Sequence, residues 1–275
     1  MLNTAAVNYI GHSGFLVDFD GNAVIIDYYK RKFNEKWSIP LPKDPQKYRS
    51  ITVLVSHKHS DHFNPKIFSW RQERPNIAYV ISSDAREQVA AALESLERKG
   101  TSAEGTPNIT FLERGEKVTV NGHEIGAFGS TDEGISFHIY SNNMSVFHAG
   151  DFNYWHWSEE STEEAVREAR EAFDKELSLI REEICDLDIA FFPVDPRMGA
   201  DFYRGAVLFC EEMTPSWLIP MHFPEEFEIP CAFEKEIETV TTYFKLAIEK
   251  EPTVFERDPS CDNYLENACD DEDDD

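Results

Sequence analysis

The sequence has few basic residues and no long hydrophobic run. Of its 275 residues, 26 are lysine or arginine and 52 are aspartate or glutamate, so the formal net charge is −26. Non-specific binding to nucleic acid depends on lysine and arginine displacing counterions from phosphates. No apolar stretch approaches the roughly 20 residues of a membrane-spanning helix. We therefore expect neither nucleic acid nor a membrane as a partner.

Cysteine is also scarce, and the five cysteines form no CxxC pair. An odd number at irregular spacings suits a reducing compartment better than a disulfide framework. The first residues contain no basic segment followed by an apolar stretch, which a secretory signal would require. These features predict a cytoplasmic protein, and they leave a homo-oligomer open.

The acidic excess is partly concentrated at the end of the chain. Residues 266–275 read ENACDDEDDD, a run of solvated charge. Segments of this composition bury too little apolar surface to fold. No linker divides the residues before it. We expect one domain over residues 1–258 and an acidic, disordered tail over residues 259–275.

Strand and helix patterns alternate along the predicted domain. Residues 51–55 are an unbroken apolar run, typical of a strand buried on both faces. Strands are also predicted at 14–19, 23–27, 77–81, 109–112, 117–120, 123–128, 134–140, 144–148, 188–193 and 216–220, and helices at 83–99, 161–184, 204–213 and 234–249. The implied layer order has sheets inside and helices outside.

A cluster of metal-ligand side chains follows the buried run. His57, His59, Asp61 and His62 stand at HxHxDH spacing. If the strand continues, His57 and His59 project to one side and can hold one ion. A turn near Ser60 would bring Asp61 and His62 to a second ion, with donors that suit zinc, iron or manganese. A surface loop that merely contains histidines is the simpler alternative, but four ligand-type residues at this spacing are hard to assign to chance.

HxHxDH resembles the signature of metallo-β-lactamase-fold hydrolases. In that superfamily the first two histidines hold one ion and the Asp-His pair holds the other. Two further matches follow in the family's order: FHAGD at 147–151, whose aspartate bridges both ions, and IPMHF at 219–223, which carries a final histidine. The resemblance implies Asp151 and His222 as further ligands of two divalent ions, zinc or else manganese or iron. It also implies an α+β fold, a four-layer αββα sandwich with two central mixed sheets and helices outside.

Residues 129–134, GSTDEG, depart from this pattern. The family commonly has a further histidine there, which completes the first metal site. We predict that Asp132 replaces it, with Ser130 or a water as the competing ligand, because carboxylates also ligate zinc and manganese. His12, in a GHS sequence, resembles the opening of the branch that includes L-ascorbate-6-phosphate lactonase, where it would lie near the site. That lactonase also has an aspartate at the position of the missing histidine, which favours Asp132.

The chemistry implied is hydrolysis. Two ions bridged by Asp151 would lower the pKa of a shared water to about 7. The sequence therefore predicts a metal-dependent hydrolase in which a metal-activated hydroxide attacks an ester-like bond, a lactone, phosphoester or acyl bond, of a small metabolite. Asp61, Asp151 and His148 are the predicted catalytic residues. His148 could itself ligate an ion, but we favour a hydrogen bond from it to a ligand or bound water. Asp27, which follows the apolar residues 24–26, resembles the family's usual strand-end aspartate, and this implies that it orients metal-binding histidines.

Substrate contacts are predicted from two segments. Arg197 can hold an anionic group, or it can form a structural ion pair. Trp155 and His156 lie in an aromatic segment, 152–157, that can form a pocket wall or a lid, or pack in the core.

Three other functions compete with this one. A phosphodiesterase or nuclease of the same superfamily is disfavoured by the acidic balance. An oxygen-reducing di-iron protein is disfavoured by His59, where such proteins carry glutamate. A non-catalytic metal-binding relative stays open because one histidine is missing.

Overall fold

Two seven-stranded mixed sheets form the centre of the molecule. The computed structural model describes residues 3–29, 47–224, 233, 235, 237, 243–244 and 251–257. In spatial order, the first sheet contains β14 (Thr253–Glu256), β1 (Thr4–Gly11), β2 (Gly14–Phe19), β3 (Asn22–Ile26), β4 (Ser50–Val55), β5 (Ala78–Ser82) and β6 (Asn108–Leu112). The second contains β13 (Tyr243–Phe244), β12 (Trp217–Met221), β11 (Ile189–Pro193), β10 (Met144–His148), β9 (Ser136–Ser141), β8 (His123–Phe128) and β7 (Lys117–Val120).

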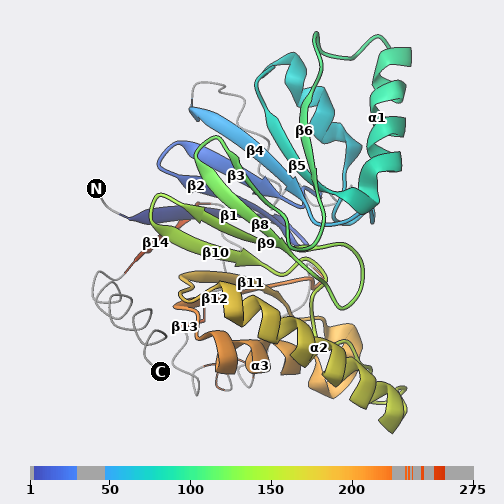
Figure 1. Ribbon diagram of the computed structural model, residues 1–275, viewed down its shortest axis with the longest axis vertical. Helices are drawn as coiled ribbons and strands as arrows, with labels where there is room; N and C mark the ends of the chain where they lie inside the picture. The colour runs from blue at the N-terminus through green and yellow to red at the C-terminus, as the bar shows by residue number, and fades with distance from the viewer. Residues whose placement is uncertain are drawn as a thin grey trace, which may run out of the picture.

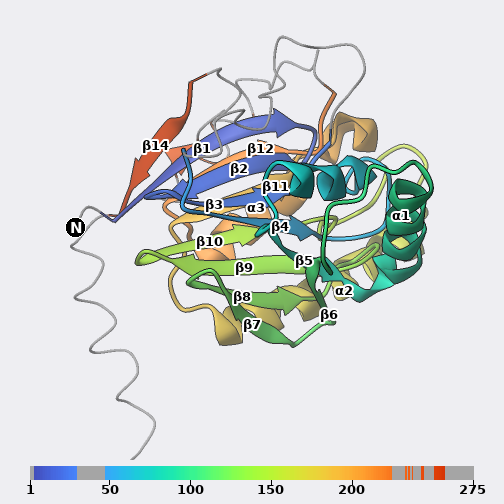
Figure 2. The ribbon, with the colours of Figure 1, turned by 90° about the horizontal axis from the view of Figure 1, so that it is seen from above.

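Each sheet combines an antiparallel half with a parallel half. Strands β14, β1, β2 and β3 are antiparallel neighbours, and β3 to β6 run parallel. In the second sheet β7 to β10 form the antiparallel half, side by side in Figure 2, and β10 to β13 run parallel. The carboxyl ends of parallel strands lie on one edge of a sheet, where binding sites of α/β proteins form. Both sheets therefore offer such an edge.

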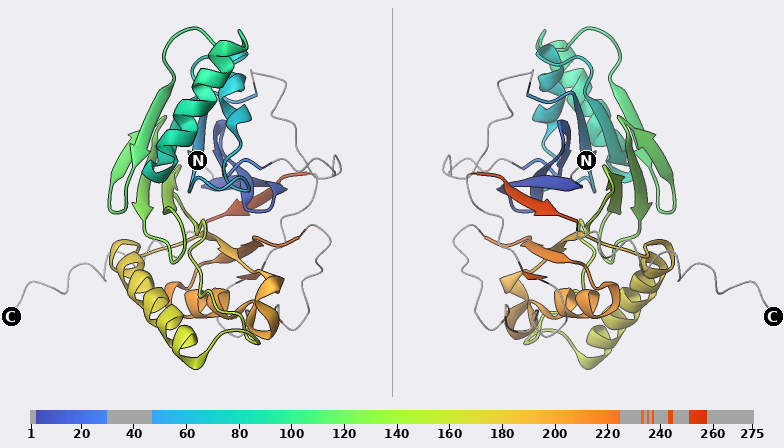
Figure 3. Two further views of the ribbon diagram at one scale, coloured as in Figure 1. Left: turned by 90° about the vertical axis from the view of Figure 1, so that its right-hand side faces the viewer. Right: turned by 90° about the vertical axis from the view of Figure 1, so that its left-hand side faces the viewer.

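Helices cover the outer face of each sheet. The first sheet carries η1 (Pro65–Gln72), η2 (Ser83–Ala85) and α1 (Arg86–Arg98), and the second carries η3 (Pro196–Asp201), α2 (Glu163–Glu183) and α3 (Arg204–Met213). Figures 1 and 3 show α1 at one end of the molecule and α2 with α3 at the opposite end. The predicted four-layer α+β sandwich, with two central mixed sheets and helices outside, is confirmed.

Side chains on the two faces of the first sheet pack in two different hydrophobic clusters. In β4, Val53 packs in the cluster beneath α1 and η1, while Leu54 packs in the larger cluster between the two sheets. Both side chains have no exposed surface. Successive strand residues point to opposite faces, so a strand covered on both sides must be apolar throughout. This is the physical reason for the unbroken run at 51–55.

Most observed elements lie close to the predicted ones. Strands β1 and β14 and the helices η1 and η3 were not predicted; β1 and β14 pair over a long sequence separation that local patterns do not reveal. In the predicted helix 234–249, residues Tyr243–Phe244 form β13 against β12. The remainder of that prediction lies mostly outside the described residues, as does the predicted tail at 259–275. Within the described parts of the chain, no helix is long and apolar enough to cross a membrane.

Candidate metal centre

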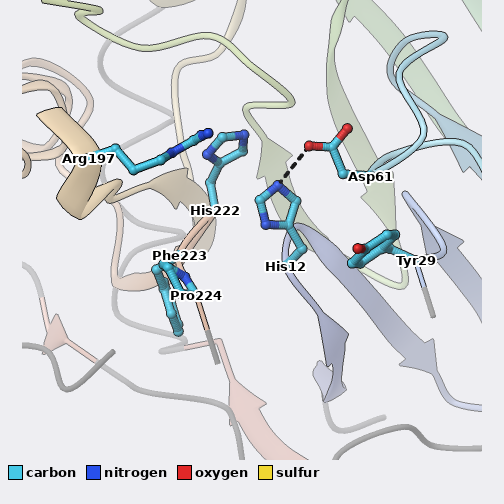
Figure 4. Close-up of a pocket in the computed structure, with 7 residues that line it drawn as sticks. All are labelled: His12, Tyr29, Asp61, Arg197, His222, Phe223 and Pro224. Atoms are coloured by element: carbon cyan, nitrogen blue, oxygen red, sulfur yellow. Dashed lines mark ion pairs between the residues drawn. The ribbon is translucent and has the colours of Figure 1, made fainter. Parts of the chain in front are cut away.

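The ligand-type side chains gather where strands of both sheets end. His57 follows β4, Asp151 follows β10 and His222 follows β12, while His12 lies in the turn between β1 and β2. The parallel pairing of β10, β11 and β12 brings the last two strand ends to one edge. Figure 4 shows His12 and His222 facing each other from the two sheets.

The ligand atoms form two groups. His57, His59 and Asp151 make the first group, and the second contains His12, Asp61, His62 and His222. Within each group the ligand atoms lie within 4.8 Å of one another. These distances allow one cation to contact all members of a group. Six of the seven predicted ligands fall in these groups, together with His12.

Asp151 links the two groups. Its Oδ2 lies 3.2 Å from Nε2 of His57, and its Oδ1 lies 3.1 Å from Nε2 of His62 and 3.4 Å from Nε2 of His222. The carboxylate thus faces the first group with one oxygen and the second with the other. That is the position which the family resemblance implies for a bridging aspartate.

Several of these atoms have unused hydrogen-bonding capacity. Nε2 of His12, His57 and His62 and Oδ1 of Asp151 are buried without a hydrogen-bond partner among the described residues. The short contacts of Asp151 with His57 and His62 are ion-pair distances that lack hydrogen-bond alignment. Buried polar atoms are nearly always paired, so a cluster of exceptions requires an explanation. Neutral imidazole nitrogens and carboxylates converging in this way fit a divalent transition metal.

The charges of the centre also suit cations. Burial raises the pKa of Asp151, but contacts with His222, His57 and His62 lower it well below its usual value. Burial lowers the pKa of His62, whereas Asp27 and Asp151 raise it to about 10. The carboxylates are therefore ionised and attract positive charge, which a divalent ion can supply in place of imidazole protons.

Asp27 fixes the orientation of His62. Its Oδ2 accepts a hydrogen bond from His62 Nδ1 at 2.7 Å, and its Oδ1 accepts one from the Ser56 backbone N–H at 2.8 Å. Ser56 Oγ donates to Oδ2 at 2.6 Å, and Asp27 has no exposed surface. With Nδ1 occupied, His62 presents Nε2 to the centre.

Asp195 does the same for His222, and the sequence did not reveal it as a site residue. Its Oδ2 lies 3.0 Å from His222 Nδ1. The guanidinium of Arg197 pairs with the same carboxylate, with Nε 2.9 Å from both oxygens. Of the two interpretations of Arg197, the structural ion pair is thus present. The available signal was the position of Asp195 two residues after a buried strand, which is similar to that of Asp27.

His148 lies behind the centre. Its Nε2 donates to the Ser13 carbonyl at 2.8 Å, and its Nδ1 accepts from the Gly150 N–H at 3.2 Å. The side chain is fully buried, and Nδ1 lies 4.0 Å from Asp27 Oδ2. His148 belongs to neither ligand group. Its contacts therefore support the loop before Asp151, and its predicted catalytic role stays a prediction.

A pocket of about 420 Å³ opens beside the ligand groups. Trp155 forms one wall, where its Nε1 donates to the Asp151 carbonyl at 2.7 Å and its ring stacks on Trp157 at 6.4 Å between centroids. The other lining residues are His59, Asp61, Thr131, Asp132, Asp151, Arg197 and His222. A smaller pocket of about 180 Å³ shares Asp61, Arg197 and His222 with it (Figure 4).

Two predicted site residues lie apart from the ligand groups. Asp132 is exposed and lines the larger pocket, but its carboxylate is in neither group. His156 is buried, with Nε2 3.3 Å from Asp201 Oδ2 and Nδ1 3.3 Å from the Tyr154 carbonyl. It lines neither of the two pockets at the centre. Both roles stay predictions.

Known proteins share this fold and sequence pattern. The family model of the beta-lactamase superfamily domain matches residues 6–166. A UPF0173 metal-dependent hydrolase from Methanopyrus kandleri is 25% identical over 267 residues, covering 91% of this chain and 99% of the relative.

Two solved structures are similar in fold. Igni18, a metallo hydrolase from Ignicoccus hospitalis, has a TM-score of 0.62 at 20% identity and covers 93% of this chain and 100% of its own. CmlA, a diiron β-hydroxylase from Streptomyces venezuelae, has a TM-score of 0.60 at 11% identity and covers 92% of this chain and 54% of its own. These two likenesses show the fold alone, because hydrolase and hydroxylase share it. With more than half of its length matched by the family model, with its sandwich fold and with its ligand groups, this chain belongs to the beta-lactamase superfamily and is a metal-dependent hydrolase.

Proposed function

We propose that this chain uses two metal ions to hydrolyse an ester-like bond, a lactone, phosphoester or acyl bond, of a small metabolite. The observation that carries the proposal is the meeting of two ligand groups at Asp151, whose two oxygens lie 3.2 Å from His57 and 3.1 Å from His62. Histidine-rich groups with carboxylates suit zinc first, and manganese or iron next.

Bound ions would lower the pKa of a water to about 7 and polarise a substrate oxygen. The chain's own residues provide the orientation. Asp27 and Asp195 hold Nδ1 of His62 and His222, so that both rings direct Nε2 inward. Asp61 borders both pockets, and its contact with His12 keeps its pKa low, so its carboxylate is ionised and can hold a cation or accept a hydrogen bond from a bound water.

The pocket supports a small substrate with an anionic group. Its volume of about 420 Å³ is within the usual range of small-molecule sites, roughly 300–1,000 Å³. Trp155 and Trp157 offer a flat apolar wall, and the Arg197 side chain, 66% exposed, places a cation at the rim. We propose that the substrate is one of the lactonase-like branch and that the protein acts in the cytoplasm. Asp132, which is exposed and lies outside both groups in this structure, is proposed as a further and only weakly held ligand of the first ion.

Metal analysis and a substrate panel test this function. Protein purified without added metal is analysed for bound transition metals, and then assayed with lactones, phosphodiesters and thioesters. We expect one to two equivalents of metal and hydrolysis of one substrate class. Less than one equivalent, or no hydrolysis by protein loaded with two equivalents, would overturn the proposal.

Two histidine variants distinguish loss of a metal ligand from a general effect of removing a histidine. His59→Ala removes a ligand-group residue and should abolish turnover. His138→Ala is the matched control, because Nε2 of His138 contacts Ser145 Oγ at 2.9 Å and the side chain belongs to neither ligand group. Equal loss of activity in both variants would show that His59 has no special role.

A further inference from the structure

The turn between β1 and β2 holds His12 in an unusual backbone conformation. His12 has φ +54°, in the left-handed region that non-glycine residues seldom adopt. Its carbonyl accepts a hydrogen bond from the His222 backbone N–H at 3.2 Å, which links the two sheets. His222 itself has φ +65°. Strained residues of this kind persist where the surroundings over-determine them, often at binding sites.

The His12 imidazole is directed into the second ligand group. Its Nε2 lies 3.4 Å from Asp61 Oδ2, and its ring centroid lies 4.3 Å from that of His222 and 5.5 Å from that of His62. Figure 4 shows the ring between Asp61 and His222. The side chain is 18% exposed, and Nε2 is buried without a hydrogen-bond partner among the described residues. A fourth ligand atom therefore stands within 4.8 Å of the other three.

The first group is poorer in ligands. It consists of His57, His59 and the shared Asp151, and His59 is exposed. The segment that would complete it contains no histidine, and the carboxylate of Asp132 lies outside the group. One group thus has two residues of its own, while the other has four and also contacts Asp151.

We propose that His12 is a ligand of the second metal ion, and that the two metal sites are therefore unequal. The second site binds its ion first and tightly, because four protein ligands close it as in structural sites. The first site binds its ion weakly and exchanges it, since it keeps open positions for substrate. This inference rests on the proposed two-metal function. It assigns the exchangeable ion, which would contact the substrate, to the site of His57 and His59.

Metal titration of the full chain tests this inference. Protein stripped with a chelator is titrated with Zn²⁺ by calorimetry and with Co²⁺ by visible absorption. Wild type should show two binding events of different affinity. His12→Gly should weaken the tight event at least about 100-fold, more than the 10–100-fold typical of residues that only orient a ligand. Glycine is chosen because it adopts φ +54° without strain.

Two further measurements distinguish a ligand from a structural residue. Free imidazole can occupy the space left by the missing ring, so millimolar imidazole should restore the tight event and the Co²⁺ spectrum of His12→Gly. His59→Ala should weaken the low-affinity event, which is binding at the first site, and leave the tight event unchanged. A tight event that is unaltered in His12→Gly, or that imidazole does not restore, would overturn the inference.

The outcomes also separate this inference from the proposed function. If wild type binds no Zn²⁺ or Co²⁺, the two-metal hydrolase proposal fails, and this inference fails with it. If wild type binds two equivalents with equal affinity and His12→Gly matches it, only the assignment of His12 and the inequality of the sites fail.

Discussion

Gly134→Ala should destabilise the protein far more than the same substitution at a glycine that has positive φ but open space around it. Gly134 has φ +71°, and a Cβ there would lie 2.2 Å from the Ser56 carbonyl oxygen and 2.4 Å from His57 Cβ. Both atoms belong to the chain segment that carries the metal-ligand motif. The neighbouring Ile135 N–H donates to the same Ser56 carbonyl at 3.0 Å, so the backbone cannot move apart without losing that bond.

The expected magnitude has two parts. The left-handed conformation costs an alanine about 1–2 kcal/mol. The clash adds at least the roughly 1–3 kcal/mol of an overpacked core, because one of the clashing atoms is backbone. Together they predict a loss of about 2–5 kcal/mol, which lowers the Tm of a domain of this size by about 2–4 °C for each kcal/mol.

Gly122→Ala provides the control. Gly122 has φ +83°, but a Cβ there would meet nothing within 4 Å. It therefore carries the conformational cost without the clash. Urea unfolding of the two variants and the wild type, each stripped of metal, measures the difference. Equal free energies of unfolding for Gly134→Ala and Gly122→Ala would refute the argument that the clash with Ser56 and His57 matters.

Three other perturbations have defined outcomes. Asp27→Asn should weaken metal binding about 10–100-fold in chelator competition, because His62 loses the carboxylate that orients it; unchanged affinity would contradict this. Zn²⁺ at about 100 times its Kd should stabilise the folded chain by about 2.7 kcal/mol in thermal unfolding, and removing it with a chelator should reverse the gain. Burial lowers the pKa of His123 from 6.5 to about 4, so below pH 6.5 the unfolded chain binds a proton that the folded chain does not. Stability should then fall by up to about 3 kcal/mol between pH 6.5 and 4, and His123→Asn should reduce that slope in urea titrations at each pH.

The sequence by itself determined the local features of this protein. The apolar run of β4 reveals a doubly buried strand, because strand side chains alternate between two faces and both must be apolar. The HxHxDH motif is also recognisable from the sequence. Its four ligand residues, His57, His59, Asp61 and His62, lie within one short segment, so their spacing is visible without the tertiary structure. The alternation of strand and helix patterns indicated the order of the layers, and the family resemblance then implied Asp151 and His222 as further ligands.

Only the tertiary structure decided the contacts between segments distant in sequence. The pairing of Asp195 with His222 and Arg197 depends on the parallel register of β11 and β12, which local patterns do not encode. The same holds for His12, which reaches the second ligand group only because β1 and β12 belong to facing sheets. His148 likewise contacts the Ser13 carbonyl only because β10 and the turn between β1 and β2 belong to facing sheets. Which distant residues come into contact depends on strand register and on the packing of the two sheets, and these are properties of the whole sandwich.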